Sequence, residues 1–127
     1  MPIAKSQRFF SGERTFTKSA RVPAGSGAQL IISGVSGERS VVSLRFVNTH
    51  ATDDYVVNVW FVPKEETLGT EHLFYPNVMT VKAGKAFMEP GTKDSPLYTL
   101  GYGAEMYVET VSGEGNVFYT ISEDAKC

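Results

Sequence analysis

Apolar and polar residues alternate along two neighbouring runs of the sequence, residues 41–47 and 55–62. Because successive side chains of a β-strand point to opposite faces, each run has one strongly apolar face. Pro63 ends the second run, since proline has no amide hydrogen to give to a neighbouring strand. We predict that the two runs form a central hairpin around a polar turn at 48–54. The core candidates of this hairpin are Leu44, Phe46, Val57 and Val59.

Shorter runs of the same kind lie on either side of this hairpin, separated by turns rich in glycine, proline and serine. The predicted strands are 14–20, 28–33, 78–81, 86–88, 97–100, 104–111 and 116–122, with a short aromatic run at 72–75. The last two strands have matching apolar faces, so a second hairpin is predicted there. No stretch has helical periodicity. The pattern predicts an all-β, single-domain antiparallel β-sandwich of eight to nine short strands, either jelly-roll or Ig-like, without substantial helix.

The N-terminal part of the chain differs from the rest in charge. Five of the first 21 residues are lysine or arginine, against the single acidic residue Glu13, whereas the remaining residues include seven basic and thirteen acidic ones. We predict an N-terminal arm at 1–12, a β-sandwich domain at 13–122 and a polar C-terminal tail at 123–127. A basic leader on an acidic body favours contact with another acidic surface, such as a neighbouring copy. An ordinary solvated strand is the alternative interpretation.

Two adjacent aromatic residues, Phe9 and Phe10, stand in the predicted arm beside Arg8. Burial of one such ring is worth about 1.5–3 kcal/mol, which is enough to anchor an arm in a groove of the same subunit or of a partner. Packing of both rings on the domain's own core explains the pattern equally well. The residues predicted to bind a partner through the arm are Arg8, Phe9, Phe10 and Arg14.

The chain of 127 residues is long enough for one domain whose core needs no disulfide or metal. Its one cysteine, Cys127, is the last residue, so an internal disulfide is impossible and synthesis in a cytoplasm is expected. The N-terminus has no apolar signal core, and no apolar run approaches the roughly 20 residues that span a bilayer. We therefore expect no membrane partner, and the acidic body argues against a nucleic-acid partner.

Motifs for catalysis are incomplete. Residues 34–37 (Gly-Val-Ser-Gly) fall one residue short of a nucleophile elbow, and Gly84-Lys85 lacks the earlier glycine and the hydroxyl residue of a phosphate-binding loop. Paired carboxylates at 53–54, 65–66 and 123–124 fall in predicted loops or the tail, where solvated charge is expected. We predict a protein that is not an enzyme, with no catalytic residue.

Candidate ligands for a metal are equally sparse. His50 lies near Asp53 and Asp54, but a hard cation gathers more oxygen ligands, so a solvated turn is the preferred interpretation. His72 stands beside aromatic residues and is expected to be packed or at an interface. No metal and no cofactor are predicted. Tyrosines such as Tyr75 leave carbohydrate binding open as a further function, although most of them lie in predicted strands.

Several segments follow one another in a characteristic order. Val22–Gly25 precedes an apolar strand, Leu44–Thr49 leads through a polar turn to Val57–Pro63, Val81–Lys85 follows, and Leu100–Val108 opens the last hairpin. This order, over roughly four fifths of the chain, resembles that of small bacteriophage virion proteins, in particular capsid decoration (cement) and minor structural proteins with a β-sandwich fold. The chain departs from the family at residues 103–105, Gly-Ala-Glu, where Gly-Asp is usual.

The resemblance implies a non-enzymatic virion structural protein, made in the bacterial host cytoplasm and located on the capsid surface. Its partners would be the phage major capsid protein and copies of itself, and a homotrimer around a local three-fold axis is a natural arrangement. A tail, adaptor or baseplate component is the alternative within the virion. A carbohydrate-binding β-sandwich module is the alternative outside it.

Trp60 is the unusual member of the central run. It alternates off the face formed by Val57, Val59 and Phe61. An exposed aromatic side chain of this size marks a contact surface, and a covered one requires a second packed layer. We predict that Trp60 lies in a second core layer or contacts another chain.

Overall fold

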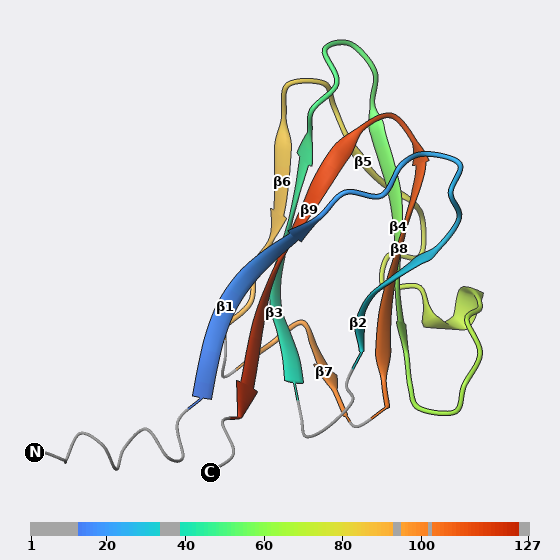
Figure 1. Ribbon diagram of the computed structural model, residues 1–127. Helices are drawn as coiled ribbons and strands as arrows, with labels where there is room; N and C mark the ends of the chain where they lie inside the picture. Colours follow the sequence, from blue (N-terminus) through green and yellow to red (C-terminus); the bar gives the residue numbers. More distant parts are fainter. Residues whose placement is uncertain (1–12, 34–38, 93–94, 102, 125–127) are drawn as a thin grey trace, which may run out of the picture.

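The computed structural model describes residues 13–33, 39–92, 95–101 and 103–124, and more than half of them lie in strands (Figure 1). The strands are β1 (Glu13–Ala20), β2 (Gln29–Ser33), β3 (Arg39–Asn48), β4 (Tyr55–Val62), β5 (Met79–Val81), β6 (Ala86–Glu89), β7 (Tyr98–Leu100), β8 (Glu105–Ser112) and β9 (Gly115–Asp124). A short 3-10 turn, η2 (Thr70–His72), which was not predicted, is the one helical element within these ranges. The predicted all-β class is confirmed.

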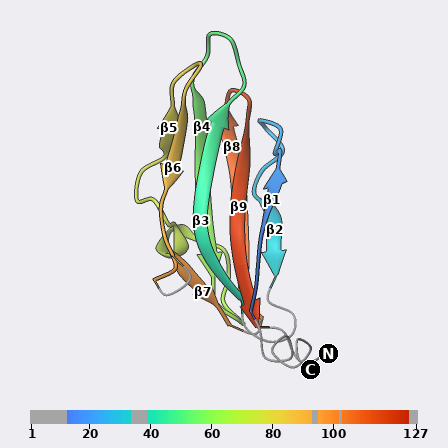
Figure 2. The same cartoon turned by 90° about the vertical axis from the view of Figure 1, so that its left-hand side faces the viewer.

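Two antiparallel sheets pack face to face to form a β-sandwich (Figure 2). One sheet has the order β1-β9-β3-β6, with β7 also paired to β3, and the other has the order β2-β8-β4-β5. The first half of the chain therefore runs beside the second half in reverse, because β1 pairs with β9, β2 with β8, β3 with β6 and β4 with β5. Such a paired ribbon folded over on itself is a jelly roll, which decides between the two predicted architectures.

Both predicted hairpins are wrong, because the two strands of each pair lie in different sheets. β3 pairs with β9 and β4 pairs with β8, so the connections β3–β4 and β8–β9 are arches that lead from one sheet to the other. The two arches pack together at one end of the sandwich, where the Thr49 amide donates to the Glu114 carbonyl at 3.1 Å. Gly113 has a φ of 83°, and a Cβ atom there would lie 2.1 Å from the Asp54 carbonyl oxygen. Glycine is therefore what permits this close approach.

The alternation nevertheless identified the core correctly. Leu44, Phe46, Val57 and Val59 are at most 1% exposed. Alternation reports which face of a strand is apolar, and an arch turns the apolar faces of its two strands toward each other across the core. The other members of the same apolar cluster include Val41, Tyr55, Met106, Val108, Val117 and Ile121.

The last strand extends further than predicted. β9 continues to Asp124, and β1 pairs with it over its whole length, from Glu13 opposite Asp124 to Ala20 opposite Val117. Residues 123 and 124 therefore belong to the sheet rather than to the predicted polar tail. The ladder to β1 supplies the backbone partners that keep this polar segment extended.

One side of the sandwich is open. β1 and β2 are the edge strands of their respective sheets and lie on the same side of the molecule (Figure 2). The prediction that the polar strand near residues 14–20 is an edge strand is confirmed. Natural sheets protect such an edge with charges or cover it, because its unpaired backbone groups can pair with another chain.

Candidate functional site

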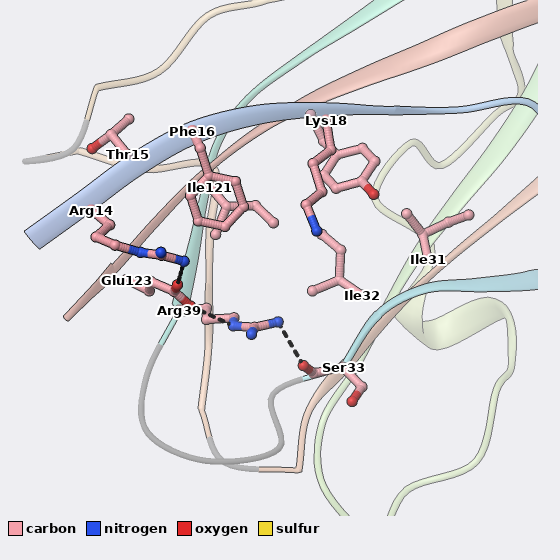
Figure 3. A pocket seen from close by; sticks show the side chains of 11 residues that line it. Arg14, Thr15, Phe16, Lys18, Ile31, Ile32, Ser33, Arg39, Ile121 and Glu123 are labelled. Atoms are coloured by element: carbon pink, nitrogen blue, oxygen red, sulfur yellow. Dashed lines mark hydrogen bonds and ion pairs between the residues drawn. The ribbon is translucent and has the colours of Figure 1, made fainter. Parts of the chain in front are cut away.

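A groove of about 680 Å³ lies between the edge strands β1 and β2. β1 turns alternate side chains toward it, so Arg14, Phe16 and Lys18 come from one face of the strand, as Figure 3 shows. The groove is lined by Arg14, Thr15, Phe16, Lys18, Ile31, Ile32, Ser33, Arg39, Tyr119, Ile121 and Glu123.

The floor of the groove is part of the core. Ile32, Tyr119 and Ile121 are between 2% and 7% exposed, and Phe16 and Ile31 pack against the same apolar cluster. Above this floor the Arg14 guanidinium lies 5.1 Å and the Lys18 ammonium 5.6 Å from the centre of the Phe16 ring, within the range of cation–π attraction. The groove thus combines an apolar floor with a cationic rim.

An ion-pair network lies at one end of the groove. Arg14 Nη2 donates to Glu123 Oε1 at 2.6 Å, and Arg39 Nε donates to Glu123 Oε2 at 2.9 Å. Arg39 Nη1 also donates to the Ser33 carbonyl at 3.1 Å. Because Ser33 ends β2, the network ties the two sheets together at this end (Figure 3).

Glu123 is held in its ionised form by this network. Partial burial alone would raise the pKa of its carboxyl group, but the hydrogen bonds and charges of Arg14 and Arg39 outweigh burial and keep the pKa below its ordinary value. A carboxylate with a lowered pKa is a poor general acid at neutral pH. The network is therefore suited to structure and to binding. The prediction that the carboxylate of Glu123 is merely solvated is wrong.

Charge in the groove is unbalanced. Arg14, Lys18 and Arg39 are three cations, and Glu123 is the single lining carboxylate, which leaves two positive charges. Lys18 has no ion-pair partner among the residues that the structure describes. The groove can therefore attract an anionic group while its floor accepts apolar side chains.

The structure describes two of the predicted partner-binding residues, Arg14 and Trp60, and does not bring them together. Arg14 lies in β1 at the rim of the groove, and its side chain is 65% exposed. Arg8, Phe9 and Phe10 lie outside the described residues, so their predicted role stays a prediction. Trp60 belongs to β4, in the other sheet and away from the groove.

Trp60 lies on the face of β4 that is turned away from the main core. It is 9% exposed and stands outside the main apolar cluster, while an isolated β-bridge brings Leu73 beside it. The Phe74 amide also donates to the Val59 carbonyl at 2.8 Å. Segment 70–75 thus runs along this end of β4, and little of the tryptophan surface remains for another chain.

The tyrosine that was considered for sugar binding is engaged within the chain. The Tyr75 hydroxyl donates to Glu89 Oε1 at 3.2 Å, and its ring packs edge-on against Phe46 and Phe74. Burial, followed by the neighbouring Glu89 carboxylate, raises the pKa of Tyr75 far above its ordinary value. A ring with both its edge and its hydroxyl occupied offers little of the flat exposed surface that stacks on a sugar.

Each histidine contacts groups close to it in the sequence. His50 Nδ1 accepts hydrogen bonds from the backbone amides of Thr52 and Asp53. His72 Nε2 lies 3.1 Å from the carboxylate oxygen Oε1 of Glu66. Within the described ranges, no group of three or more histidine, cysteine or acidic side chains is close enough to hold a metal ion. In the same residues, no helix has the length and apolar character to cross a bilayer.

Comparisons with known proteins assign no family. No protein-family model matches the sequence, and no curated protein sequence matches it. Among solved structures, a chain from the disulfide-linked pili of Bacillus endospore appendages is 12% identical, with a TM-score of 0.46 over 92% of this chain and 90% of that one. A chain from infectious bursal disease virus, Gx strain, is 11% identical, with a TM-score of 0.34 over 89% of this chain and 34% of that one. Similarities at this level do not establish a function, so the resemblance to phage decoration proteins remains a prediction.

Three groove residues were missed from the sequence. Lys18, Arg39 and Glu123 come from three different strands, β1, β3 and β9, and only the sheet order brings them together. One local signal was available for Lys18, because Arg14, Phe16 and Lys18 share one face of a predicted edge strand. No spacing in the sequence indicates that Arg39 and Glu123 meet.

Proposed function

We propose that this protein is a non-enzymatic structural protein of a bacteriophage virion, and that it decorates the capsid surface. The observation that carries the proposal is the open side of the sandwich, where two strand edges flank an apolar groove with a cationic rim. An open edge of this kind is suited to joining one protein to another. The order of segments that resembles capsid decoration proteins supports the choice of partner, and jelly rolls recur among viral capsid domains.

Adhesion is the proposed mechanism. The sandwich acts as a rigid block, and the basic segment at residues 1–12, which joins β1 at the groove, reaches a capsid subunit or a neighbouring copy. Weak contacts repeated over a symmetric shell add up to strong avidity. Three copies around a local three-fold axis fit this role, because assemblies of identical subunits are mostly closed and cyclic.

Co-sedimentation with capsids tests the proposal. The full chain is mixed with expanded capsids assembled from the major capsid protein of the same phage, and bound protein is measured across concentrations. We expect saturable binding that falls at least tenfold when Arg8, Phe9 and Phe10 are all replaced by alanine. A Lys5→Ala variant, which removes one charge from the same segment, is the matched control and should bind nearly normally. Full binding by the triple variant would reject the arm, and no binding by the full chain would reject the proposed function.

Sedimentation equilibrium of the free protein tests the arrangement of copies. A trimer is expected. Rings or tubes in solution would instead indicate a tail component and would overturn placement on the capsid.

A further inference from the structure

The free edge of β1 carries a defined pattern on the face that lines the groove. Arg14, Phe16 and Lys18 present a cation, an aromatic ring and a second cation at successive inward positions. The opposite edge of β1 pairs with β9, so the edge beside the groove is unpaired in the described sheet. A strand added there would place its own inward side chains directly opposite these three, at about 4.5–5.5 Å between Cβ atoms.

We propose that this edge receives an extended segment of a partner protein with the pattern acidic–x–apolar–x–acidic. The two acidic side chains would face Arg14 and Lys18, and the apolar one would cover Phe16 and the floor at Ile32. Two carboxylates would also balance the two positive charges that Glu123 leaves in the groove. Backbone hydrogen bonds to the free edge supply affinity, and the alternate side chains supply specificity.

The 127 residues of this sequence offer no available segment with this pattern, so a different protein is the proposed donor. Glu105 and Glu109 are the only two acidic residues four positions apart in this sequence, and both edges of their strand, β8, are taken by β2 and β4. Residues 1–12 directly precede β1 in the sequence, but they contain Lys5 and Arg8 and no carboxylate. Like charges placed opposite each other on neighbouring strands are destabilising, so this segment is a poor occupant. Under the proposed function, the donor of the acidic strand is the capsid protein, and this identification rests on that function.

A peptide titration tests the inference without any capsid. The probe is the blocked heptapeptide Thr-Glu-Thr-Val-Thr-Glu-Thr, and the matched control has lysine in place of both glutamates. Amide shifts of the ¹⁵N-labelled full chain are followed by NMR. We expect shifts concentrated in β1 and β2, with the glutamate peptide bound at least about tenfold more tightly than the lysine peptide, since two favourable cross-strand charge pairs replace two unfavourable ones.

Charge reversal in the protein sharpens the test. Lys18→Glu should remove the preference for the glutamate peptide, whereas Lys85→Glu, the same change at an exposed lysine outside the groove, should preserve it. Equal affinity for both peptides, no shifts in β1 and β2 at millimolar peptide, or an unchanged preference in Lys18→Glu would each overturn the inference. Any of these results would mean that Arg14 and Lys18 serve only to prevent unspecific pairing of other chains with the edge of β1.

Two further results separate this inference from its alternatives. A dimer of the free protein that protects β1 amides and is not dissociated by the glutamate peptide would assign the groove to a second copy and overturn the inference. Capsid binding without peptide binding would refute the inference that the groove binds an acidic strand, and would leave the proposed function standing. Peptide binding without capsid binding would refute the proposed function and leave the groove's chemistry intact.

Discussion

Replacing Glu123 by glutamine isolates the charge at the centre of the network beside the groove. Glu123→Gln keeps the size and shape of the side chain and removes its negative charge. Two arginines from different strands, Arg14 of β1 and Arg39 of β3, then face an amide in place of a carboxylate. The change therefore tests whether electrostatics hold this corner of the sandwich together.

The expected loss of stability follows from the exposure of the partners. Arg14 is 65% exposed, so its ion pair is screened and is worth about 0.2–1 kcal/mol. Arg39 is 30% exposed, and a hydrogen bond to a charged group is worth about 1.5–3 kcal/mol, part of which the amide oxygen retains. We expect the free energy of unfolding to fall by about 1–2 kcal/mol at pH 7. For a chain of this size, that is a drop in Tm of about 4–7 °C.

Dependence on pH identifies the cause of the loss. The pKa of Glu123 is lower in the folded state than in the unfolded chain, so its contribution is fully present above the unfolded value of about 4.3. The contribution disappears as the pH falls through the folded pKa. The difference in stability between Glu123→Gln and the unmodified protein should therefore shrink steadily below about pH 4.5.

Urea unfolding followed by circular dichroism between pH 3 and pH 7 measures this difference. Glu109→Gln is the matched control, because Glu109 is also a strand residue but accepts its hydrogen bond from the neutral amide of Asn58. Its effect should stay below about 0.5 kcal/mol. A loss for Glu123→Gln that is the same at pH 3 and pH 7 would refute the electrostatic explanation, and no loss at pH 7 would show that the network contributes nothing.

Two other changes test the arch and the second layer. Gly113→Ala and Gly25→Ala both place alanine at a positive φ, but only at Gly113 would the new Cβ atom meet backbone, so Gly113→Ala should cost about 1–3 kcal/mol more in urea unfolding. Equal losses would contradict the close packing of the two arches. Trp60→Ala should lower the free energy of unfolding by about 3–5 kcal/mol, because the ring is buried within the chain. Because Trp60 is the only tryptophan, the native tryptophan fluorescence reports on it alone, and burial of the ring should shift that emission to the blue. Emission like that of tryptophan in water would contradict its placement.

The position of the strands could be predicted from the sequence because alternation has a local cause. The β4 bounds, Tyr55 to Val62, match the predicted run, and its inward residues Val57 and Val59 are fully buried. Partners could not be predicted in the same way. A hairpin and an arch give the same alternation, and the short link after Ser112 is typical of a hairpin. The signal against a hairpin was the pair of glycines around Glu114, where backbone from two arches approaches closely.

The candidate site could not be predicted in full either, because it depends on which strands are neighbours. Arg14 was identified from its local charge, since it lies in a basic, polar run. Its contacts with Glu123 and, through that carboxylate, with Arg39 depend on β9 lying between β1 and β3. Sequence separations of 109 and 84 residues divide Glu123 from these two arginines. Groups this far apart along the chain are brought together by topology, which no short motif encodes.

Pairing of the earliest described strand with the latest one has a consequence for how the protein is made. β1 and β3 both use β9 as a neighbour, so neither ladder can form before the last described strand has been synthesised. Until then β1 lacks its neighbour and β3 can pair only with β6 and β7, and loop closure between residues 13–20 and 117–124 opposes the β1–β9 pairing. Completion of the fold should therefore wait until β9 has left the ribosome and should then take milliseconds to seconds, as in other β-proteins dominated by distant contacts. Nascent chains will spend that interval with strand edges unpaired, which makes the closeness of neighbouring chains on a polysome an aggregation hazard.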